Sequence, residues 1–363
     1  MVVADLVADD DTAGDVAGGS TPDAEVAAPV ETILPVDRHA ALWPFAPDSP
    51  WNTPLGAGVA FEPEDGPMTE ALHAEELDGD VVGSWLNSEE FSIPVVQASA
   101  DDPVVEIDDA FREDAAINLP EGAGPAAGTD GHLVVIRPDG RHADEFFSLR
   151  EGDDGWTSER HHVTDLLGSG LGPEAGVRAY GGSALGGLVR RWEVDRDDPG
   201  YTDGVIRHAL AVALPASMLR YDDGEPGYDD AGYGTALGYV WPATEQDYDS
   251  PEDYGGPIPM GTLLAIPPDI DLGALDLPRE LHAIATALQT YGAYVVDRAA
   301  GAVTLYAEPG VPDGWLDVVR GPDASAAGLE RLRQLLRVVT NNAPTSVGGG
   351  GERRAAPAPP LSS

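Results

Sequence analysis

Residues 132–149, HLVVIRPDGRHADEFFSL, contain the pattern that decides the fold class. The runs HLVVI (132–136) and RHADEFFSL (141–149) are rich in the β-branched and aromatic residues that strands favour. Between them, Pro138, Asp139 and Gly140 are residue types that form tight turns. The stretch therefore predicts a β-hairpin.

Short apolar runs between turn residues continue the strand pattern along the chain. They are FSIPVVQ (91–97), PVVEI (103–107), a short strand at 156–157, VIRHALAVALP (205–215), LGYVWPA (237–243) and GTLLAIP (261–267). The segment 293–308, AYVVDRAAGAVTLYAE, predicts a second hairpin, and apolar residues at helical spacing predict helices at 277–292 and 324–339. We expect a mainly β fold, a β-sandwich or jelly-roll-like body with one or two packed α-helices.

Composition divides the chain into three parts. Residues 1–38 are acidic and aperiodic, which indicates a tail or tether. Residues 39–340 form the predicted β-rich body. Residues 341–363 are rich in Gly and Pro, which predicts an extended tail.

The charge of the chain limits its partners. Asp and Glu number 64 against 20 basic residues, all of them Arg, for a net charge of −44. Such a charge repels nucleic acids and anionic membranes, so we expect no nucleic-acid partner and no membrane insertion. A salt-adapted host and a high-GC genome both fit this Lys-free composition.

The start of the chain, MVVADLVADDDTAG, lacks the basic region and apolar run of a signal peptide. We therefore expect either a cytosolic product or release by another route, such as lysis or assembly into a larger particle. The absence of Cys excludes disulfides and thiol catalysis.

Motifs for metals and cofactors are missing. The eight His residues do not have zinc-site spacing, and no phosphate-binding loop with Lys can exist in this chain. We predict no metal and no cofactor. The Gly-rich segment GGSALGG (181–187) is interpreted as a tight loop with close backbone packing.

Three polar residues share a strand face with apolar neighbours. His132 aligns with Val134 and Ile136, Glu145 with Phe147 and Leu149, and His208 with Ile206 and Leu210. In a sandwich each would point to the inner face. Burial would raise the pKa of the Glu145 carboxyl and a protonated His would lower it, so the group could act in acid–base catalysis. The alternative is a buried His–Glu hydrogen bond that only joins two sheets.

A glycosidase needs a second carboxyl group, for which Glu193 and Asp297 are candidates. Arg190 could hold an acidic sugar or a substrate carboxylate. Aromatic residues supply a further indication, because sugar rings stack on aromatic faces. They include Trp51, Trp85, Trp156, Trp192, Trp241 and Trp315, and a cluster of Tyr228, Tyr233, Tyr239, Tyr248 and Tyr254.

Among these, the predicted ligand-binding residues are Arg190, Trp241, Tyr239 and Trp156. The acidic, Tyr-rich stretch 228–254 also suits calcium, or no ligand at all. Both alternatives stay open on sequence grounds.

Several ordered segments resemble a family of secreted actinobacterial β-rich proteins. These are DSPWNTPL, HLVVI…DEFFSL…GWT, GGSALGGLVR, VIRHALAVALP, YVWPAT, IPMGTLLAIP and LHAIATALQTYGAYVVD, which together span roughly residues 43 to 320. The activity of that family is poorly defined and is often taken to concern carbohydrates. The tail after NNAP (341–344) resembles the ends of minor tail proteins of actinobacteriophages, which lysis would release without a signal peptide.

These observations lead to one expectation with alternatives. We expect a phage-tail or other extracellular protein, located in the virion or outside the cell, that engages cell-surface polysaccharide and attaches to other virion or surface proteins through its termini. The alternatives are a purely structural virion or surface subunit, a polysaccharide-degrading enzyme that uses Glu145, and a cytosolic halophilic enzyme. An open groove with Glu145 and His208 at its floor would favour binding or catalysis, whereas sealing of both would favour the structural role.

Overall fold

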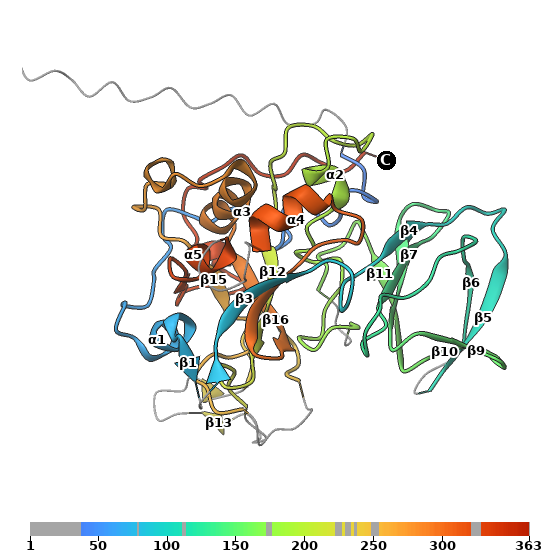
Figure 1. Cartoon of the computed structure of the whole chain (residues 1–363), viewed down its shortest axis with the longest axis horizontal. Coiled ribbons are helices and arrows are strands. Elements are labelled where there is room, and N and C mark those ends of the chain that lie inside the picture. Colours follow the sequence, from blue (N-terminus) through green and yellow to red (C-terminus); the bar gives the residue numbers. More distant parts are fainter. Residues whose placement is uncertain are drawn as a thin grey trace, which may run out of the picture. The chain divides into compact units, whose positions relative to one another are not determined.

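A six-stranded mixed sheet forms the centre of the larger part of the protein (Figure 1). The computed structural model describes residues 38–77, 80–110, 114–171, 176–221, 227–228, 234–235, 238–247, 254–320 and 328–362, all of which belong to one unit by their contacts. The strands of this sheet, in spatial order, are β18 (Arg337–Val338), β15 (Leu263–Ala265), β16 (Ala293–Ala299), β12 (Leu210–Pro215), β17 (Ala302–Tyr306) and β3 (Gly83–Asn87). The sequence LAVALP of β12 has apolar side chains on both faces, and all six residues are buried, as a central strand requires.

The segment 293–308 does not form the predicted hairpin. Its two strands, β16 and β17, are neighbours in sequence, but β12 lies between them in the sheet. β12 runs parallel to β16 and antiparallel to β17, and bonds to both. The apolar strand β12 needs a partner on each edge to satisfy its backbone, and this requirement separates the two strands.

Helices pack around this sheet. They are α1 (Pro67–His73), α2 (Arg191–Val194), α3 (Arg279–Thr290), α4 (Asp313–Arg320) and α5 (Leu329–Arg333), with short 3₁₀ turns η2 (Leu272–Leu275) and η3 (Val347–Gly349). The helix predicted at 277–292 is confirmed as α3. The helix predicted at 324–339 is wrong in extent, because residues 337–338 pair with β15 as β18 and only 329–333 are α-helical among the described residues.

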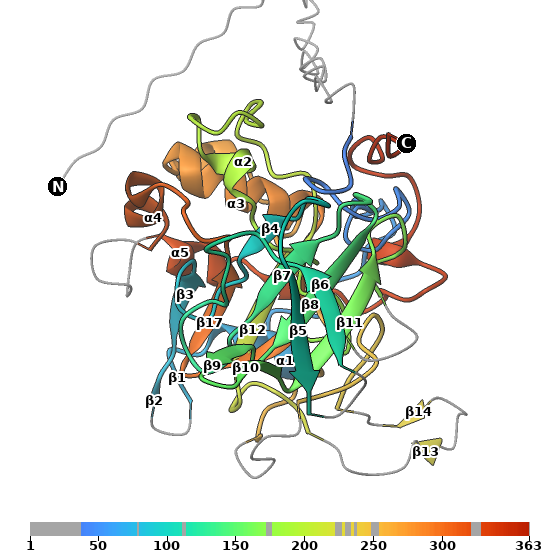
Figure 2. The same cartoon turned by 90° about the vertical axis from the view of Figure 1, so that its right-hand side faces the viewer.

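A separate β-sandwich is built from two four-stranded sheets, and Figure 2 views it face on. The inner sheet, in spatial order, contains β11 (Arg160–Asp165), β8 (His142–Phe147), β7 (Leu133–Ile136) and β4 (Val95–Gln97). The outer sheet contains β6 (Ala115–Asn118), β5 (Val104–Asp109), β10 (Gly155–Ser158) and β9 (Arg150–Gly152). The predicted hairpin at 132–149 is confirmed, because β7 and β8 pair antiparallel across the 138–140 turn. The protein is mainly β, as expected.

The central strands of the inner sheet, β7 and β8, are buried on both faces. Leu133, Val135 and Phe146 face the small sandwich core, whereas Val134 and Ala143 belong to the main core of the protein. Glu145 pairs with Val134 in the β7–β8 register and shares its face. The parity argument therefore placed Glu145 on a buried face, but that face contacts the main body rather than the sandwich interior.

The two ends of the described chain meet on the body. Residues from Asn341 onward, expected to form an extended tail, have little regular structure but lie against the first described residues. Arg38 pairs with Leu361, and Gly56 pairs with Arg353. Ala358 is buried with Trp43 and Trp192 in a small apolar cluster, defined here as the Trp43 cluster. The body therefore extends to the C-terminal segment, and it includes Arg38, which is 1% exposed.

Two small two-stranded sheets complete the described structure. They are β1 (Glu76–Leu77) with β2 (Asp80–Val81), and β13 (Gly227–Tyr228) with β14 (Gly234–Thr235). Tyr233 and Tyr248 of the predicted aromatic cluster lie outside the described residues. Among the described residues, every helix is too short or too polar to span a lipid bilayer.

Candidate functional site

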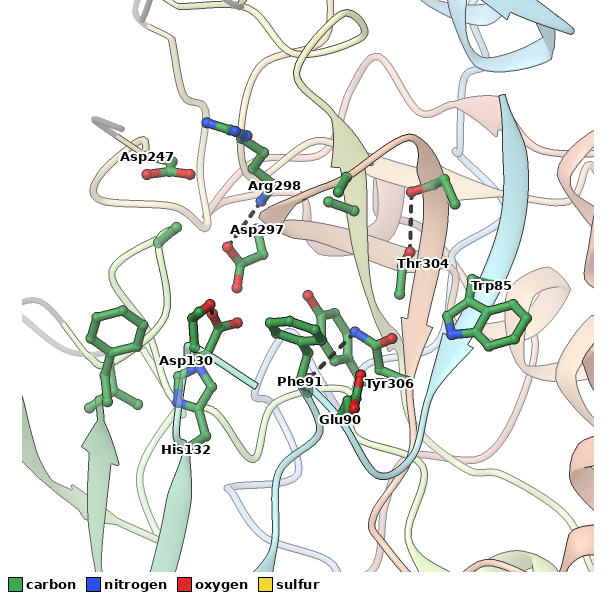
Figure 3. Close-up of a pocket in the computed structure, with 18 of the residues that line it drawn as sticks. Trp85, Glu90, Phe91, Asp130, His132, Asp247, Asp297, Arg298, Thr304 and Tyr306 are labelled. Carbon is green, nitrogen blue, oxygen red and sulfur yellow. Dashed lines mark hydrogen bonds between the residues drawn. The ribbon is translucent and has the colours of Figure 1, made fainter. Parts of the chain in front are cut away.

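A cleft of about 1500 Å³ lies where the β-sandwich meets the six-stranded sheet. One side consists of β3, β17 and the end of β16. The other side consists of the loop before β7, the end of β8 and the start of β11, and residues 245–247 close part of the rim. Figure 3 shows Asp130 and His132 on the sandwich side and Thr304 and Trp85 on the side of the six-stranded sheet.

Strand alternation builds one wall of the cleft. β3 and β17 are parallel, with Trp85 opposite Thr304 and Asn87 opposite Tyr306. Trp85, Asn87, Thr304 and Tyr306 line the cleft, whereas Leu86 and Leu305 between them do not and belong to the main core, in which Tyr306 also packs. On that buried side, the hydroxyl of Ser84 donates to Glu330 Oε2 of α5 at 2.7 Å, and α4 also packs against β3. The helices cover one face of this edge of the sheet and leave the other face to the cleft.

Asp297 lies in this wall at the end of β16. Val212 of β12 pairs with Val295, but the next residue, Ala213, pairs with Asp297, so Val296 is an extra residue in the strand. A β-bulge of this kind bends the strand and re-aims the side chain that follows. The Asp297 side chain is 20% exposed. Burial, opposed by the Arg178 cation and reinforced by two nearby carboxylates, raises the pKa of Asp297 to about 7.

Asp130 faces Asp297 from the sandwich side (Figure 3). It sits in the turn before β7, where Ser148 N donates to its carbonyl at 2.6 Å and the Thr129 hydroxyl donates to its Oδ1 at 3.2 Å. Burial raises the pKa of Asp130 as well. Asp130 and Asp247 are the two carboxylates that raise the pKa of Asp297.

Arg178 lies behind the wall that carries Asp297. It is 1% exposed, and its guanidinium carbon stacks over the Tyr306 ring at 3.9 Å from the centroid. Its Nη1 lies 3.6 Å from Asp297 Oδ2, within ion-pair distance. Within the described part of the chain, its side-chain nitrogens have no hydrogen-bond partner of good geometry. A buried cation without such partners is costly, and this one points at the carboxyl group in the cleft.

Aromatic faces line the same cleft. Trp85 is 37% exposed, with the Arg320 guanidinium stacked on it at 4.6 Å, and Phe91, Phe147 and Tyr306 complete the set. Phe91 has a φ of 55°, in the left-handed region that a non-glycine residue occupies at a cost of about 1 kcal/mol. Its backbone is held by Phe91 N donating to Ala127 O at 2.9 Å. Strained residues that a fold holds in this way cluster at ligand sites.

Glu145, the predicted catalytic carboxyl, does not line this cleft and is fully buried. Its Oε1 accepts hydrogen bonds from the hydroxyls of Thr164 at 2.6 Å and Ser183 at 2.5 Å, and its Oε2 accepts one from Ala184 N at 2.7 Å. Burial raises the pKa of Glu145. The carboxylate therefore ties β8 and β11 to the Gly-rich segment 181–187.

His208 is also sealed inside the protein. Its Nε2 lies 3.1 Å from Glu193 Oε2, and its Nδ1 lies 2.9 Å from the Ala209 carbonyl oxygen. Burial opposes the charged imidazolium, but the Glu193 carboxylate outweighs this effect and raises the pKa of His208. The adjoining cavity has only about 10 Å³, too little for a ligand. The buried His–Glu bond of the structural alternative thus exists, but it joins His208 to Glu193.

Arg190 belongs to the same sealed region. Its Nε donates to Glu308 Oε2 at 3.0 Å, and its Nη1 donates to the carbonyls of Ala41 and Leu42. These bonds fix the start of α2, and Arg190 is only 7% exposed, so the acidic-sugar role predicted for Arg190 has no open site.

Besides Asp297, named as a candidate second acid, His132 is the predicted catalytic or ligand-binding residue that lines the cleft. Burial and the Arg178 cation lower the pKa of His132 to about 3, so its ring is neutral. Nδ1 lies 3.1 Å from the Phe146 carbonyl oxygen and, in the tautomer that this acceptor favours, donates to it. Trp156, Tyr239 and Trp241 lie outside the cleft lining. Trp156 packs on the sandwich core, and Tyr239 packs on the main core.

Sequence reasoning named Asp297 only as a second acid and missed Asp130, Arg178, Phe91 and Tyr306. The alternation in GSWLN (83–87) and AVTLY (302–306) carries the signal for Trp85 and Tyr306. Asp130 and Arg178 lie outside helices and strands, and no local pattern shows that their segments meet.

No protein-family model, curated protein or solved structure matches the chain. Within the described residues, no group of three or more His, Asp or Glu side chains is placed to hold a metal ion.

Proposed function

We propose that the chain binds a neutral or amine-bearing polysaccharide in this cleft, as an extracellular or virion-borne protein. The observation that carries this proposal is the combination of aromatic faces and carboxylates in one cleft. Trp85, Phe91 and Phe147 offer stacking surfaces, and Asp130, Asp297 and Asp247 offer acceptors for sugar hydroxyls.

The size of the cleft supports a polymer rather than a single sugar. Its volume of about 1500 Å³ exceeds the range of roughly 300–1000 Å³ that small-molecule pockets occupy. Several consecutive sugar units therefore fit along it.

The charge of the cleft limits the kind of polymer. Seven carboxyl side chains line it, namely Glu89, Glu90, Asp130, Glu159, Glu245, Asp247 and Asp297, against three arginines, Arg160, Arg298 and Arg320. The whole chain carries −44. The negative charge of the cleft and of the whole chain would repel a polyanion rich in uronate, whereas it would not repel a neutral glucan or an amino-sugar polymer.

Affinity electrophoresis tests the proposal with three probes, a neutral β-glucan, partly deacetylated chitin and alginate. We expect retention by at least one of the first two and none by alginate. Trp85→Ala should weaken retention about 3- to 10-fold, the effect of losing one aromatic stacking contact. Trp85→Phe should restore part of it, and Trp156→Phe, outside the cleft, should have no effect.

The structural-subunit alternative has its own support, since Glu145 and His208 are sealed. Failure of all three probes to retain the folded wild-type protein would contradict the polysaccharide proposal and favour that alternative. Equal loss of retention in Trp85→Ala and Trp156→Phe would place binding outside the cleft.

A further inference from the structure

We infer that the cleft cleaves the polysaccharide that it binds, with Asp297 as the proton donor and Asp130 as the carboxylate that activates water. This inference rests on the proposed function, because it needs the polymer to lie across the same cleft. It replaces Glu145, which is sealed, with two carboxyl groups that face one open space.

The step is a hydrolysis of the glycosidic bond. Asp297 gives its proton to the bridging oxygen as the bond from the anomeric carbon to that oxygen breaks. A water molecule adds to the anomeric carbon and gives a proton to the Asp130 carboxylate. The products are two shorter chains, one with a new reducing end, and solvent exchange returns both carboxyl groups to their starting states.

The position of Asp297 on a strand suits a proton donor. The bulge at Val296 sets its direction, and Asp297 Oδ1 accepts from Arg298 N at 3.0 Å. Both features come from the backbone of β16, whose neighbour β12 is fully buried. A reacting group held in this way keeps its geometry when the polymer binds.

The buried Arg178 guanidinium next to Asp297 is a second feature that supports the assignment of the proton donor. It is a buried cation 3.6 Å from Asp297 Oδ2, without a hydrogen bond of good geometry to any described residue. A bidentate Arg–carboxylate pair would hold Asp297 permanently ionised. The looser contact lets Asp297 keep a proton and still stabilises the carboxylate that remains after the proton leaves, which makes Arg178 a positioning residue.

The two carboxyl groups share burial, Arg178 and Asp247 and differ in their other neighbours, and an acid–base pair depends on such differences. The charged and titratable groups around Asp297 are Arg178, Tyr306, Asp130, Asp247 and Arg298. Burial, with the Asp130 and Asp247 carboxylates, raises the pKa of Asp297 to about 7 against the Arg178 cation and the Arg298 N–H, which lower it, so Asp297 is protonated in mildly acidic solution. Around Asp130, burial and the Asp247 carboxylate raise the pKa, while the Thr129 hydroxyl, Arg178 and Arg150 oppose the rise.

The experiment measures new reducing ends released from whichever of the neutral β-glucan and the partly deacetylated chitin retains the protein. We expect cleavage by wild type, and a loss of about 100-fold or more in both Asp297→Asn and Asp130→Asn, with retention of the polymer unchanged. Asp154→Asn, on the exposed β9–β10 turn, is the matched control and should cleave like wild type.

The pH profile gives a second readout. Activity should fall as pH rises through about 7, because Asp297 then loses the proton that it must donate. It should also fall in acid, as Asp130, whose pKa is raised by burial, becomes protonated. Because the folded-state pKa of Asp297 is raised, its ionised form opposes folding, so Asp297→Asn should be no less stable than wild type at pH 8.

Each result of these experiments bears on a different part of the inference. Retention of a polymer by wild type without new reducing ends overturns the inference and leaves the binding proposal standing. Cleavage that survives in Asp297→Asn overturns the assignment of the donor. Loss of retention in Asp297→Asn, with the fold intact, would limit Asp297 to its binding role and overturn its role as proton donor. Absence of retention by wild type contradicts the binding proposal itself.

Discussion

The Glu145 carboxylate is fully buried and accepts three hydrogen bonds, so we expect it to stabilise the fold. In Glu145→Gln the Oε1 atom can keep the two hydroxyl donors, but the new amide N–H group faces the Ala184 N–H. We expect a loss of about 1–3 kcal/mol in the free energy of unfolding, the cost of one unsatisfied buried donor. Chemical denaturation measures it.

Glu106→Gln on the exposed face of β5 is the matched control and should leave that free energy unchanged. Polysaccharide retention should be the same in both variants. A Glu145→Gln protein of normal stability that no longer retains the polymer would return Glu145 to a functional role.

At this scale the sequence could show that His132 and Glu145 lie on buried faces, because strand parity is local. It could not show which layer covers each face, since β7 is apolar on both sides, β8 carries an apolar residue on each side, and the two strands divide these side chains between two cores. Alongside Glu193, the sequence singles out Asp297 only as a candidate second acid. Its pairing with Asp130 depends on two segments 167 residues apart and has no local signature.

Among the elements, the Gly-rich segment 181–187 contains a glycine that is required by close packing as well as by its backbone conformation. Gly187 has a φ of +74°, and a Cβ there would lie 2.2 Å from the backbone nitrogen of Ala211 in β12. Gly140, in the β7–β8 turn, has a similar φ of +66° but open space around its Cβ position. Both glycines therefore have a left-handed backbone conformation, but only at Gly140 is there space for a side chain.

We therefore expect Gly140→Ala to cost about 1 kcal/mol, the price of a left-handed Ala. Gly187→Ala should cost several times more or prevent folding, because backbone atoms of a central strand must move. Thermal denaturation of the two variants side by side measures the difference. Similar losses in both would show that the 181–187 loop yields easily and does not fix β12.

Element prediction succeeded where pairing is local and failed where it is not. The 132–149 hairpin and the helix at 277–292 follow from turn residues and periodicity within the segment. The 293–308 segment has the same hairpin pattern, yet β12, about 80 residues earlier in the chain, takes the place between its strands. Prediction from sequence therefore failed where the paired strands are far apart in the chain. Two strands that pair directly across a turn have the same local pattern as two strands with a distant strand between them.

In the whole molecule, the C-terminal segment joins parts that are far apart in sequence. Arg38 Nη1 donates to Pro359 O at 2.9 Å, Ser362 N donates to Arg38 O at 2.9 Å, and Arg354 N donates to Leu55 O at 3.1 Å. Composition alone predicts an extended tail here, because Gly, Pro and Ala bury little area each. The interaction depends instead on backbone hydrogen bonds and on the Trp43 cluster.

Truncation after Asn341 should therefore destabilise the body. It removes Ala358 from the Trp43 cluster and takes away one acceptor of the buried Arg38 guanidinium. Loss of one such bond to a charged group costs about 1.5–3 kcal/mol, and uncovering Trp43 adds to it. We expect a lower midpoint in chemical denaturation and a red-shifted tryptophan emission.

Arg353→Ala, which removes only the side-chain bonds to Pro54 and Val347, should give a smaller part of the effect. An unchanged midpoint after truncation would mean that the segment rests on the body without stabilising it, and would restore its role as a tether.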